Sequence, residues 1–312
     1  MRQREFYSIY ADDLDLYIKT KRQFGYKMNA AMTDLLSFDS FAFDYLSIGS
    51  NPRIIPNELI VSWSRQRNNE KISNTIKRMS VLREFLRFYV ALGHETFIPK
   101  LPKFKSNFSP YIFTKDEIKR IFIESDKLLV NMERKCSCVP MIIRLLYGTG
   151  MRISEALNIN ESDIDLENNL LLLHNTKNGK DRIVPINQSI KSCLLWYLEN
   201  SRHIKNGMLF NVGIGYVQHT IKQLFMTCNI HKYGKYPRVH DLRHVFCIHS
   251  FVEMLRRGLD IYEAFPILSA YIGHVYLEST EAYVRLTSIM YPELIKKSNK
   301  ICSSLFPEII EP

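Results

Sequence analysis

A proline-containing segment without periodicity, near residue 100, separates two stretches whose apolar residues recur at helical spacing. Residues 94–113 read HETFIPKLPKFKSNFSPYIF, with three prolines and several lysines. Such a composition favours an extended, solvated connection over a packed element. We therefore predict an interdomain linker over residues 98–111, with one domain on either side. A chain of 312 residues is long enough for two ordinary domains.

The stretch before this linker predicts a helical domain over residues 1–97. Apolar residues keep helical spacing from Arg4 to about Leu92. We expect a long first helix from Arg4, followed by helices over 29–46, 57–66 and 72–93. Gly93 is placed to end the last of them, because glycine commonly follows a helix in the left-handed conformation.

The stretch after the linker predicts a mixed domain over residues 112–283. Thr114 and Glu117 are spaced as a capping box that begins a helix, and helical patterns continue to about Asn158. Residues 169–186, NLLLLHNTKNGKDRIVPI, predict two short strands joined by a turn at Asn178-Gly179. Helical spacing then resumes. The predicted fold class is mainly α with a small β-sheet.

Bulk composition narrows the classes of protein. Lys and Arg number 42 against 32 Asp and Glu, giving a net charge of +10, which favours a polyanionic partner, nucleic acid ahead of a membrane surface. No window approaches the roughly 20 apolar residues of a membrane span, and the amino terminus lacks the apolar core of a secretory signal. Cys136 and Cys138 have no second cysteine pair at zinc-ligand spacing. We expect a soluble, cytoplasmic protein without a metal.

A basic segment lies in the predicted first domain. Residues 65–87 hold seven Arg or Lys against Glu70 and Glu84, interspersed with Ser, Asn and Gln donors. Phosphate contacts use this mixture of charge and small donors. The predicted DNA-contacting residues are Arg65, Arg67, Lys71, Lys77 and Arg78. A solvated helix face is the simpler interpretation when the segment is taken alone.

Two candidate cationic groups follow in the second domain. Arg152 comes after Gly148 and Gly150 in YGTGMRISEAL, where a helix begins, and a helix N-terminus beside an arginine suits an anion. Pairing of Arg152 with Glu155 is the alternative. Lys177 and Lys180 flank the predicted hairpin turn, although lysine is common in exposed turns.

The segment HDLRH supplies a histidine and a second arginine. His240 and Arg243 are three residues apart and share a helix face, which suits phosphate binding with proton transfer. His240 and His244 also resemble the two histidines of zinc hydrolases. Against zinc, Asp241 replaces the usual glutamate, Arg243 would repel a metal, and no third ligand follows at a recognisable spacing. We expect His244 to satisfy a buried polar contact.

The last candidates are in AYIGHVYLESTEAYVRL, where His274 precedes Tyr283 by nine residues. A tyrosine oxygen with its ordinary pKa of about 10 attacks phosphate poorly. Cationic groups that neutralise the phosphate and stabilise its pentacovalent transition state change this. The arginines, lysine and histidines upstream supply that need without a metal.

Together these residues resemble the tyrosine recombinase family, the phage integrases and Xer-like recombinases. The resemblance covers both domains and rests on six positions in family order: Arg152, Lys177, His240, Arg243, His274 and Tyr283. It implies a helical, SAM-like core-binding domain over 1–97 and a catalytic domain of the DNA breaking-rejoining type over 112–283. It also implies that residues 284–312 form a tail that contacts a neighbouring protomer. The hairpin reads K-N-G-K where relatives often show K-G-x-K, so Lys180 stays an alternative to Lys177.

The resemblance implies site-specific strand exchange in DNA, with Tyr283 as nucleophile and neither metal nor ATP as cofactor. The implied partners are double-stranded DNA with inverted-repeat core sites, other protomers in a synaptic tetramer, and accessory DNA-bending proteins or partner recombinases. Integration or excision of a mobile element is the favoured role, with Xer-type chromosome dimer resolution as the alternative. A type IB topoisomerase, a telomere resolvase and a catalytically inactive DNA-binding regulator stay open as other interpretations.

Overall fold

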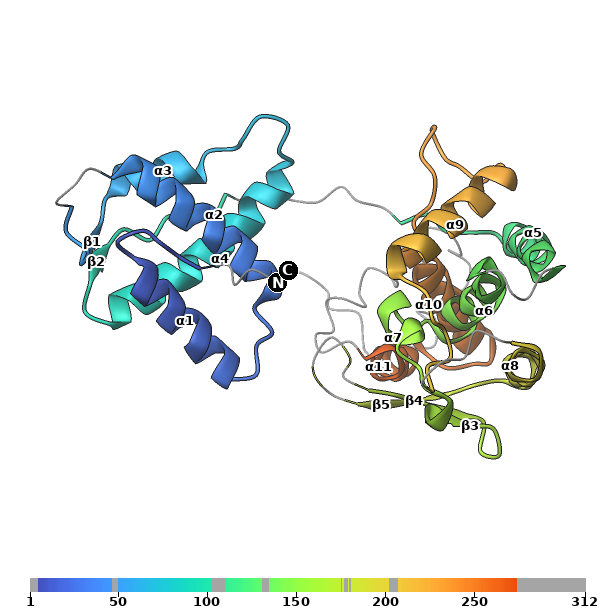
Figure 1. The fold of residues 1–312 in the computed structure, drawn as a ribbon. Helices are drawn as coiled ribbons and strands as arrows, with labels where there is room; N and C mark the ends of the chain where they lie inside the picture. Colours follow the sequence, from blue (N-terminus) through green and yellow to red (C-terminus); the bar gives the residue numbers. More distant parts are fainter. Residues whose placement is uncertain are drawn as a thin grey trace, which may run out of the picture. The chain divides into compact units, whose positions relative to one another are not determined.

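The computed structural model describes residues 5–46, 50–102, 110–130, 135–174, 176, 179, 181–201 and 207–273. The chain divides into two compact units, residues 1–107 and 108–312 (Figure 1). The division falls within 98–111, the segment for which the sequence predicts a linker. Within the described residues, no helix combines the length and the apolar character needed to cross a membrane.

Within its described residues, the first unit contains four helices, which are labelled in Figure 1. They are α1 (Ala11–Gln23), α2 (Asn29–Tyr45), α3 (Asn57–Ser64) and α4 (Ile72–Ala91). The predictions for α2, α3 and α4 are confirmed to within two residues at each end. Apolar side chains from all four helices form one core, which includes Leu14, Phe38, Leu59, Leu82 and Phe85.

The predicted first helix begins later than its apolar spacing indicates. Residues 5–7 are not helical, and α1 starts only at Ala11. The buried carboxylate of Asp39 on α2 accepts the backbone N–H groups of Tyr7 (2.8 Å) and Ser8 (3.1 Å). Because a distant side chain satisfies these N–H groups, the segment is held in a non-helical conformation before α1. Helical spacing could not reveal this contact.

A two-stranded parallel pair, β1 (Ile54–Ile55) with β2 (Glu95–Thr96), was not predicted. Two buried tyrosines stabilise it, Tyr10 immediately before α1 and Tyr89 on α4. The hydroxyl of Tyr10 donates to the Ile54 carbonyl (2.9 Å), and that of Tyr89 donates to the Pro52 carbonyl (2.6 Å). Gly93, between α4 and β2, has φ 87°, in agreement with its predicted place after the helix.

The second unit begins with α5 (Lys115–Asp126), whose predicted capping box is confirmed. The Glu117 N–H donates to Thr114 Oγ1 (3.2 Å), and the Thr114 N–H donates to Glu117 Oε2 (2.8 Å). The described helices that follow are α6 (Val139–Thr149), α7 (Ile153–Leu157), α8 (Gln188–Asn200), α9 (Ile214–Thr227), α10 (Val239–Arg256) and α11 (Ile261–Ile272). Short 3₁₀ turns lie at Lys127–Val130, Lys135–Cys138 and Glu161–Asp163.

Helices α6 and α10 lie side by side at the centre of this unit (Figure 1). Helix α6 is apolar nearly all round, with Ile142, Ile143 and Leu145 fully buried, as expected of a helix covered on several faces. It packs against α5, α7, α8, α9 and α10. Helix α10 packs against α11 on its other side, so α10 links the main core to a second cluster around Phe251 and Leu268.

A three-stranded antiparallel sheet carries the predicted hairpin. Its strands are β3 (Ile164–Asp165), β4 (Leu170–Leu173) and β5 (Arg182–Pro185), in the order β3-β4-β5. The two predicted strands are confirmed as β4 and β5, which pair with Leu173 opposite Arg182. At the turn, the Gly179 N–H donates to the Thr176 carbonyl (2.8 Å), and Gly179 has φ 71°. Asn178 lies outside the described residues, and β3 was not predicted.

Candidate active site

The Gly-Thr-Gly segment ends α6 and brings the chain close to α10. Gly150 is left-handed (φ 62°) and is the residue after the helix. A Cβ built on it would lie 2.2 Å from Cδ1 of Phe246 on α10. Both the backbone conformation and the contact therefore require glycine at this position. The turn places Arg152 immediately before α7, as the sequence predicts.

Arg243, on α10, is the most deeply buried arginine of the site. Its side chain is 2% exposed, and its Nη1 donates to the Gly150 carbonyl while Nη2 donates to the Ile272 carbonyl (2.7 Å). These two carbonyls belong to residues shortly before Arg152 and His274. Arg243 thus links the segment that carries the first candidate arginine to the segment that leads into the second candidate histidine. A guanidinium has five N–H donors, so these bonds are compatible with a phosphate contact.

Arg152 makes the pairing that the sequence left as an alternative to anion binding. Its Nη1 donates to Glu155 Oε1 (2.7 Å), and its backbone N–H donates to Glu155 Oε2 (2.7 Å). The side chain of Arg152 is 19% exposed. Because only one guanidinium nitrogen is given to this carboxylate, the ion pair orients Arg152 and leaves donor capacity for an anion.

A third arginine, which sequence reasoning missed, shares the same carboxylate. Arg182 on β5 donates from Nη1 to Glu155 Oε1 (2.9 Å) and from Nη2 to Glu155 Oε2 (2.8 Å). Burial by itself would raise the pKa of Glu155, but the hydrogen bonds from Arg182 and Arg152 outweigh it and lower that pKa. Glu155 is therefore a carboxylate held between two guanidinium groups. In the sequence, the signal for this contact is limited to the charged residues Lys-Asp-Arg at positions 180–182, where the predicted second strand begins.

His240 lies at the solvent-exposed start of α10, one turn before Arg243. Partial desolvation of its ring, together with the positive charges of Arg243, Arg238 and Arg152, lowers its pKa. The ring meets that of His244 edge to face, with centroids 4.8 Å apart. Burial and the neighbouring His240 lower the pKa of His244 to about 4. Both histidines are thus neutral near pH 7, and a neutral His240 can accept a proton.

The zinc-hydrolase interpretation of HDLRH finds no support in this geometry. Asp241 is buried and engaged by Arg238, through its N–H and Nη2, each at 2.8 Å. In the part of the chain that the structure describes, no group of three or more His, Cys, Asp and Glu residues could hold a metal ion.

The structure brings Arg152, His240 and Arg243 into one site. Lys177, its alternative Lys180, His274 and Tyr283 lie outside the described residues.

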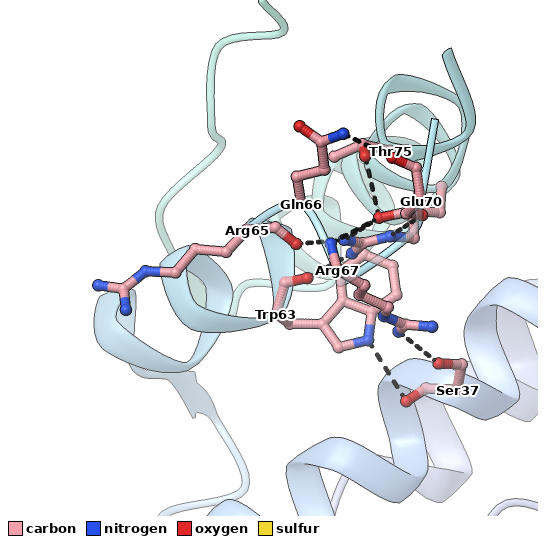
Figure 2. Close-up of polar contacts among 8 residues, drawn as sticks. Ser37, Trp63, Arg65, Gln66, Arg67, Glu70 and Thr75 are labelled. Atoms are coloured by element: carbon pink, nitrogen blue, oxygen red, sulfur yellow. Dashed lines mark hydrogen bonds and ion pairs between the residues drawn. The ribbon is translucent and has the colours of Figure 1, made fainter. Parts of the chain in front are cut away.

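The basic segment of the first unit, residues 65–87, comprises the loop 65–71 between α3 and α4 and the greater part of α4. Arg65, Arg67, Lys71 and Lys77 are exposed, as DNA contacts would require. In Figure 2 the Arg65 side chain points away from the cluster of polar contacts, while Arg67 donates from Nη2 to Ser37 Oγ (2.7 Å).

The structure corrects the prediction for Arg78. This arginine is 3% exposed, stacks on the Trp63 ring (4.5 Å to the centroid) and donates to the backbone carbonyls of Trp63 and Arg65. Its guanidinium also binds Glu70 at 2.9 and 3.0 Å, and these hydrogen bonds lower the pKa of Glu70 to about 2. Arg78 therefore stabilises the loop, because Nε, Nη1 and Nη2 of its guanidinium all donate to groups of the loop and of α3.

Comparisons with known proteins identify the family of the chain. The model of the phage integrase family matches residues 112–288. The putative integrase/recombinase y4rB of Sinorhizobium fredii is 28% identical over 304 residues, which cover 90% of this chain and 93% of that relative. Tyrosine recombinase XerA of Pyrococcus horikoshii is 31% identical over 207 residues, 65% of each chain.

A solved structure of a lambda integrase tetramer bound to a Holliday junction shares the fold. Its TM-score is 0.62 at 16% identity, with coverage of 86% of this chain and 76% of that chain. The fold is therefore that of a tyrosine recombinase, mainly α with small sheets. Because the family model spans more than half of the sequence, the chain belongs to the phage integrase family.

Proposed function

We propose that this protein is a site-specific DNA recombinase that cuts and rejoins DNA through a phosphotyrosyl intermediate. The observation that carries the proposal is the junction at Arg243, which holds the turn before Arg152 and the end of α11 against the helix that bears His240. Two arginines and a neutral histidine around one point are a constellation for a phosphodiester transition state.

In the proposed reaction, the Tyr283 oxygen attacks the scissile phosphorus. A bond forms between that oxygen and phosphorus, and the bond from phosphorus to the 5′ oxygen breaks. The products are a 3′-phosphotyrosyl link and a free 5′-hydroxyl. His240 accepts the phenolic proton, and Lys177, or Lys180 in its place, gives a proton to the leaving 5′ oxygen. A 5′-hydroxyl of the partner strand then reverses the step.

Arg152 and Arg243 are proposed to bind the non-bridging oxygens, a task that suits the planar guanidinium, and His274 to add a hydrogen bond. The covalent intermediate keeps the energy of the phosphodiester, so we propose that the reaction needs neither ATP nor a metal cofactor. We propose the cytoplasm as the compartment, because the DNA substrate is there.

The proposed partners are double-stranded DNA with inverted-repeat core sites and other copies of the chain in a tetramer. The lambda integrase tetramer on a Holliday junction supports this assembly. Residues 284–312 are proposed to contact a neighbouring protomer, residues 1–97 to bind the core site, and accessory DNA-bending proteins or a partner recombinase to assist. We propose integration or excision of a mobile element as the role, with Xer-type dimer resolution as the alternative, since both an integrase/recombinase and a XerA recombinase are similar to this chain.

The test is covalent trapping on a nicked DNA site, first selected from a random pool by binding to the purified protein. Cleavage beside the nick releases a short strand, so the protein should remain linked to DNA through tyrosine after denaturation. Trapping should survive added chelator. Binding without any trapping would favour a catalytically inactive regulator, and relaxation of site-free supercoiled plasmid would favour a topoisomerase.

Covalent trapping should depend on pH through His240. The free-protein pKa of His240 lies below the ordinary 6.5, so the histidine is neutral at pH 7 and gains its proton only as the pH falls below 6.5. The trapping rate measured below saturating DNA, which reports the free protein, should therefore fall on the acid side of pH 6.5. Arg238→Gln removes a cation that lowers this pKa, and it should move the acid limb to higher pH. An unchanged limb in both Arg238→Gln and His240→Gln would exclude His240 as the base.

DNA binding should depend on the exposed loop of the first unit. Each phosphate that a protein neutralises on B-DNA adds about 0.9 to the steepness with which log affinity falls against log salt. We expect Arg65→Ala and Lys71→Ala each to weaken binding equally on specific and random DNA and to flatten that slope. Lys19→Ala, an exposed lysine on α1, is the control. A slope identical to that of the unmodified protein in all three would remove this loop from the interface.

A further inference from the structure

Arg182 binds the same carboxylate as Arg152, that of Glu155. It can therefore influence both the orientation of Arg152 and how far Glu155 neutralises its charge. Both oxygens of Glu155 are saturated: Oε1 accepts from Arg152 Nη1 (2.7 Å) and Arg182 Nη1 (2.9 Å). Oε2 accepts from the Arg152 backbone N–H (2.7 Å) and Arg182 Nη2 (2.8 Å). A carboxylate offers about four lone-pair directions, so Arg182 fills half of the acceptor capacity of Glu155.

The sharing has an electrostatic consequence. Glu155 is 4% exposed at its side chain and Arg182 is 14% exposed, so their charges interact with little screening by water. A lone Glu155–Arg152 pair would be neutral and would oppose the attraction of Arg152 for phosphate. With Arg182 bound to the same carboxylate, the three groups carry a net charge of +1, which favours an anion beside Arg152.

Arg182 also lies where three segments of the second unit meet. It belongs to β5, which follows the hairpin turn, and its partner Glu155 is on α7. A Cβ on Gly273, the residue after α11, would be 3.2 Å from Arg182 Nη1. Near this point, the Tyr271 hydroxyl donates to the Pro185 carbonyl of β5 (3.3 Å). The Arg182 guanidinium, on the second strand of the hairpin, thus lies close both to Glu155, which binds Arg152, and to Gly273, the residue before His274.

We propose that Arg182 is a positioning residue of the recombinase site: it binds both oxygens of Glu155, fixes the direction of Arg152 and keeps Arg152 from being neutralised. The inference rests on the proposed function, because its effect is on the cleavage step. Arg182 itself does not touch the reacting phosphate. Its two-point geometry requires arginine, since lysine presents a single nitrogen.

The experiment compares Arg182→Gln and Arg182→Lys in the full-length protein on the nicked DNA site. The readouts are the single-turnover trapping rate at saturating DNA, the dissociation constant for DNA and the midpoint of thermal unfolding. Misplacement of a catalytic group by about 1 Å can cost on the order of 100-fold in rate. We expect Arg182→Gln to slow trapping by about 10- to 100-fold with a DNA affinity changed by less than about threefold. Arg182→Lys should recover part of the rate.

Two further proteins make the test specific. Arg144→Gln is the matched control, because Arg144 is 21% exposed and pairs with Asp126 at 2.8 Å in the same unit, away from Glu155. Its trapping rate should equal that of the unmodified protein. In a Glu155→Gln background, Arg182→Gln should slow trapping by less than about threefold, since residues that act as a unit are not additive.

Each outcome bears on the inference. Equal trapping by the unmodified protein and Arg182→Gln would overturn it, as would a full rate decrease that persists in the Glu155→Gln background. If Arg182→Gln does not fold, the rate of Arg182→Lys decides, and a rate equal to that of the unmodified protein again overturns it. If the unmodified protein traps no DNA through Tyr283, the proposed function fails and the inference fails with it.

Discussion

Tyr283→Phe should bind the DNA site with unchanged affinity and form no covalent complex. The substitution removes one oxygen atom and keeps the ring, so we expect DNA binding to be retained while the nucleophile is removed. Loss of a catalytic nucleophile commonly costs several orders of magnitude in rate, so we expect at least a roughly 1,000-fold decrease in trapping. The measurement is the fraction of labelled strand that remains attached to protein after denaturation, with affinity measured in parallel.

The chain offers its own controls for this substitution. Tyr276 and Tyr291 are near Tyr283 in the sequence, and neither stands at the family position of the nucleophile. Tyr276→Phe and Tyr291→Phe should trap DNA as the unmodified protein does. Trapping by Tyr283→Phe, combined with its loss in either control, would move the nucleophile to another tyrosine.

Arg243→Lys should lose both stability and catalysis. Lysine keeps the positive charge, but its single nitrogen does not reproduce the planar geometry in which Nη1 and Nη2 of Arg243 each donate to one carbonyl, of Gly150 and of Ile272. We therefore expect one of these buried carbonyls to lose its partner. An unsatisfied buried polar group costs about 1–3 kcal/mol, and we expect a loss of this size in the free energy of unfolding. The turn before Arg152 and the end of α11 would then shift together. Trapping at saturating DNA should fall by about 100-fold or more.

Arg78→Lys separates the two effects of the Arg243 substitution. Arg78 is a buried arginine that also donates to two backbone carbonyls, but it belongs to the first unit. We expect Arg78→Lys to lose similar stability while its trapping rate at saturating DNA stays close to that of the unmodified protein. Chemical denaturation and single-turnover trapping, both at a temperature where each variant is folded, give the comparison. Equal rate losses in the two variants would show that Arg243 acts through stability alone.

The elements that the sequence predicted well are those that local interactions determine. The capping box of Thr114 and Glu117 joins residues three apart, and the β4–β5 hairpin is specified by two short apolar runs and the glycine turn between them. Helices α2, α3 and α4 follow from apolar spacing. In each case the decisive contacts lie within about 20 residues, so a single sequence contains the signal.

What the sequence did not reveal depends on contacts between distant residues. The β1–β2 pair joins Ile54 to Glu95, and two-residue strands carry no periodicity. Arg78 is one of several cations in its segment of the sequence, and its burial depends on contacts with Trp63 and Glu70 that only the fold reveals. Arg182 and Glu155 are 27 residues apart on different elements, so their shared role required the fold.

The buried position of Arg243 also bears on how such proteins change in evolution. An arginine that ties the Gly150 turn to the end of α11 is under selection for folding, whether or not the protein cleaves DNA. A descendant that turned into a repressor would keep Arg243 and Gly150 for stability. Its exposed His240 and its Tyr283 would be free to drift. Among relatives of this chain, retention of His240 and Tyr283 therefore indicates DNA cleavage activity better than retention of Arg243 and Gly150 does.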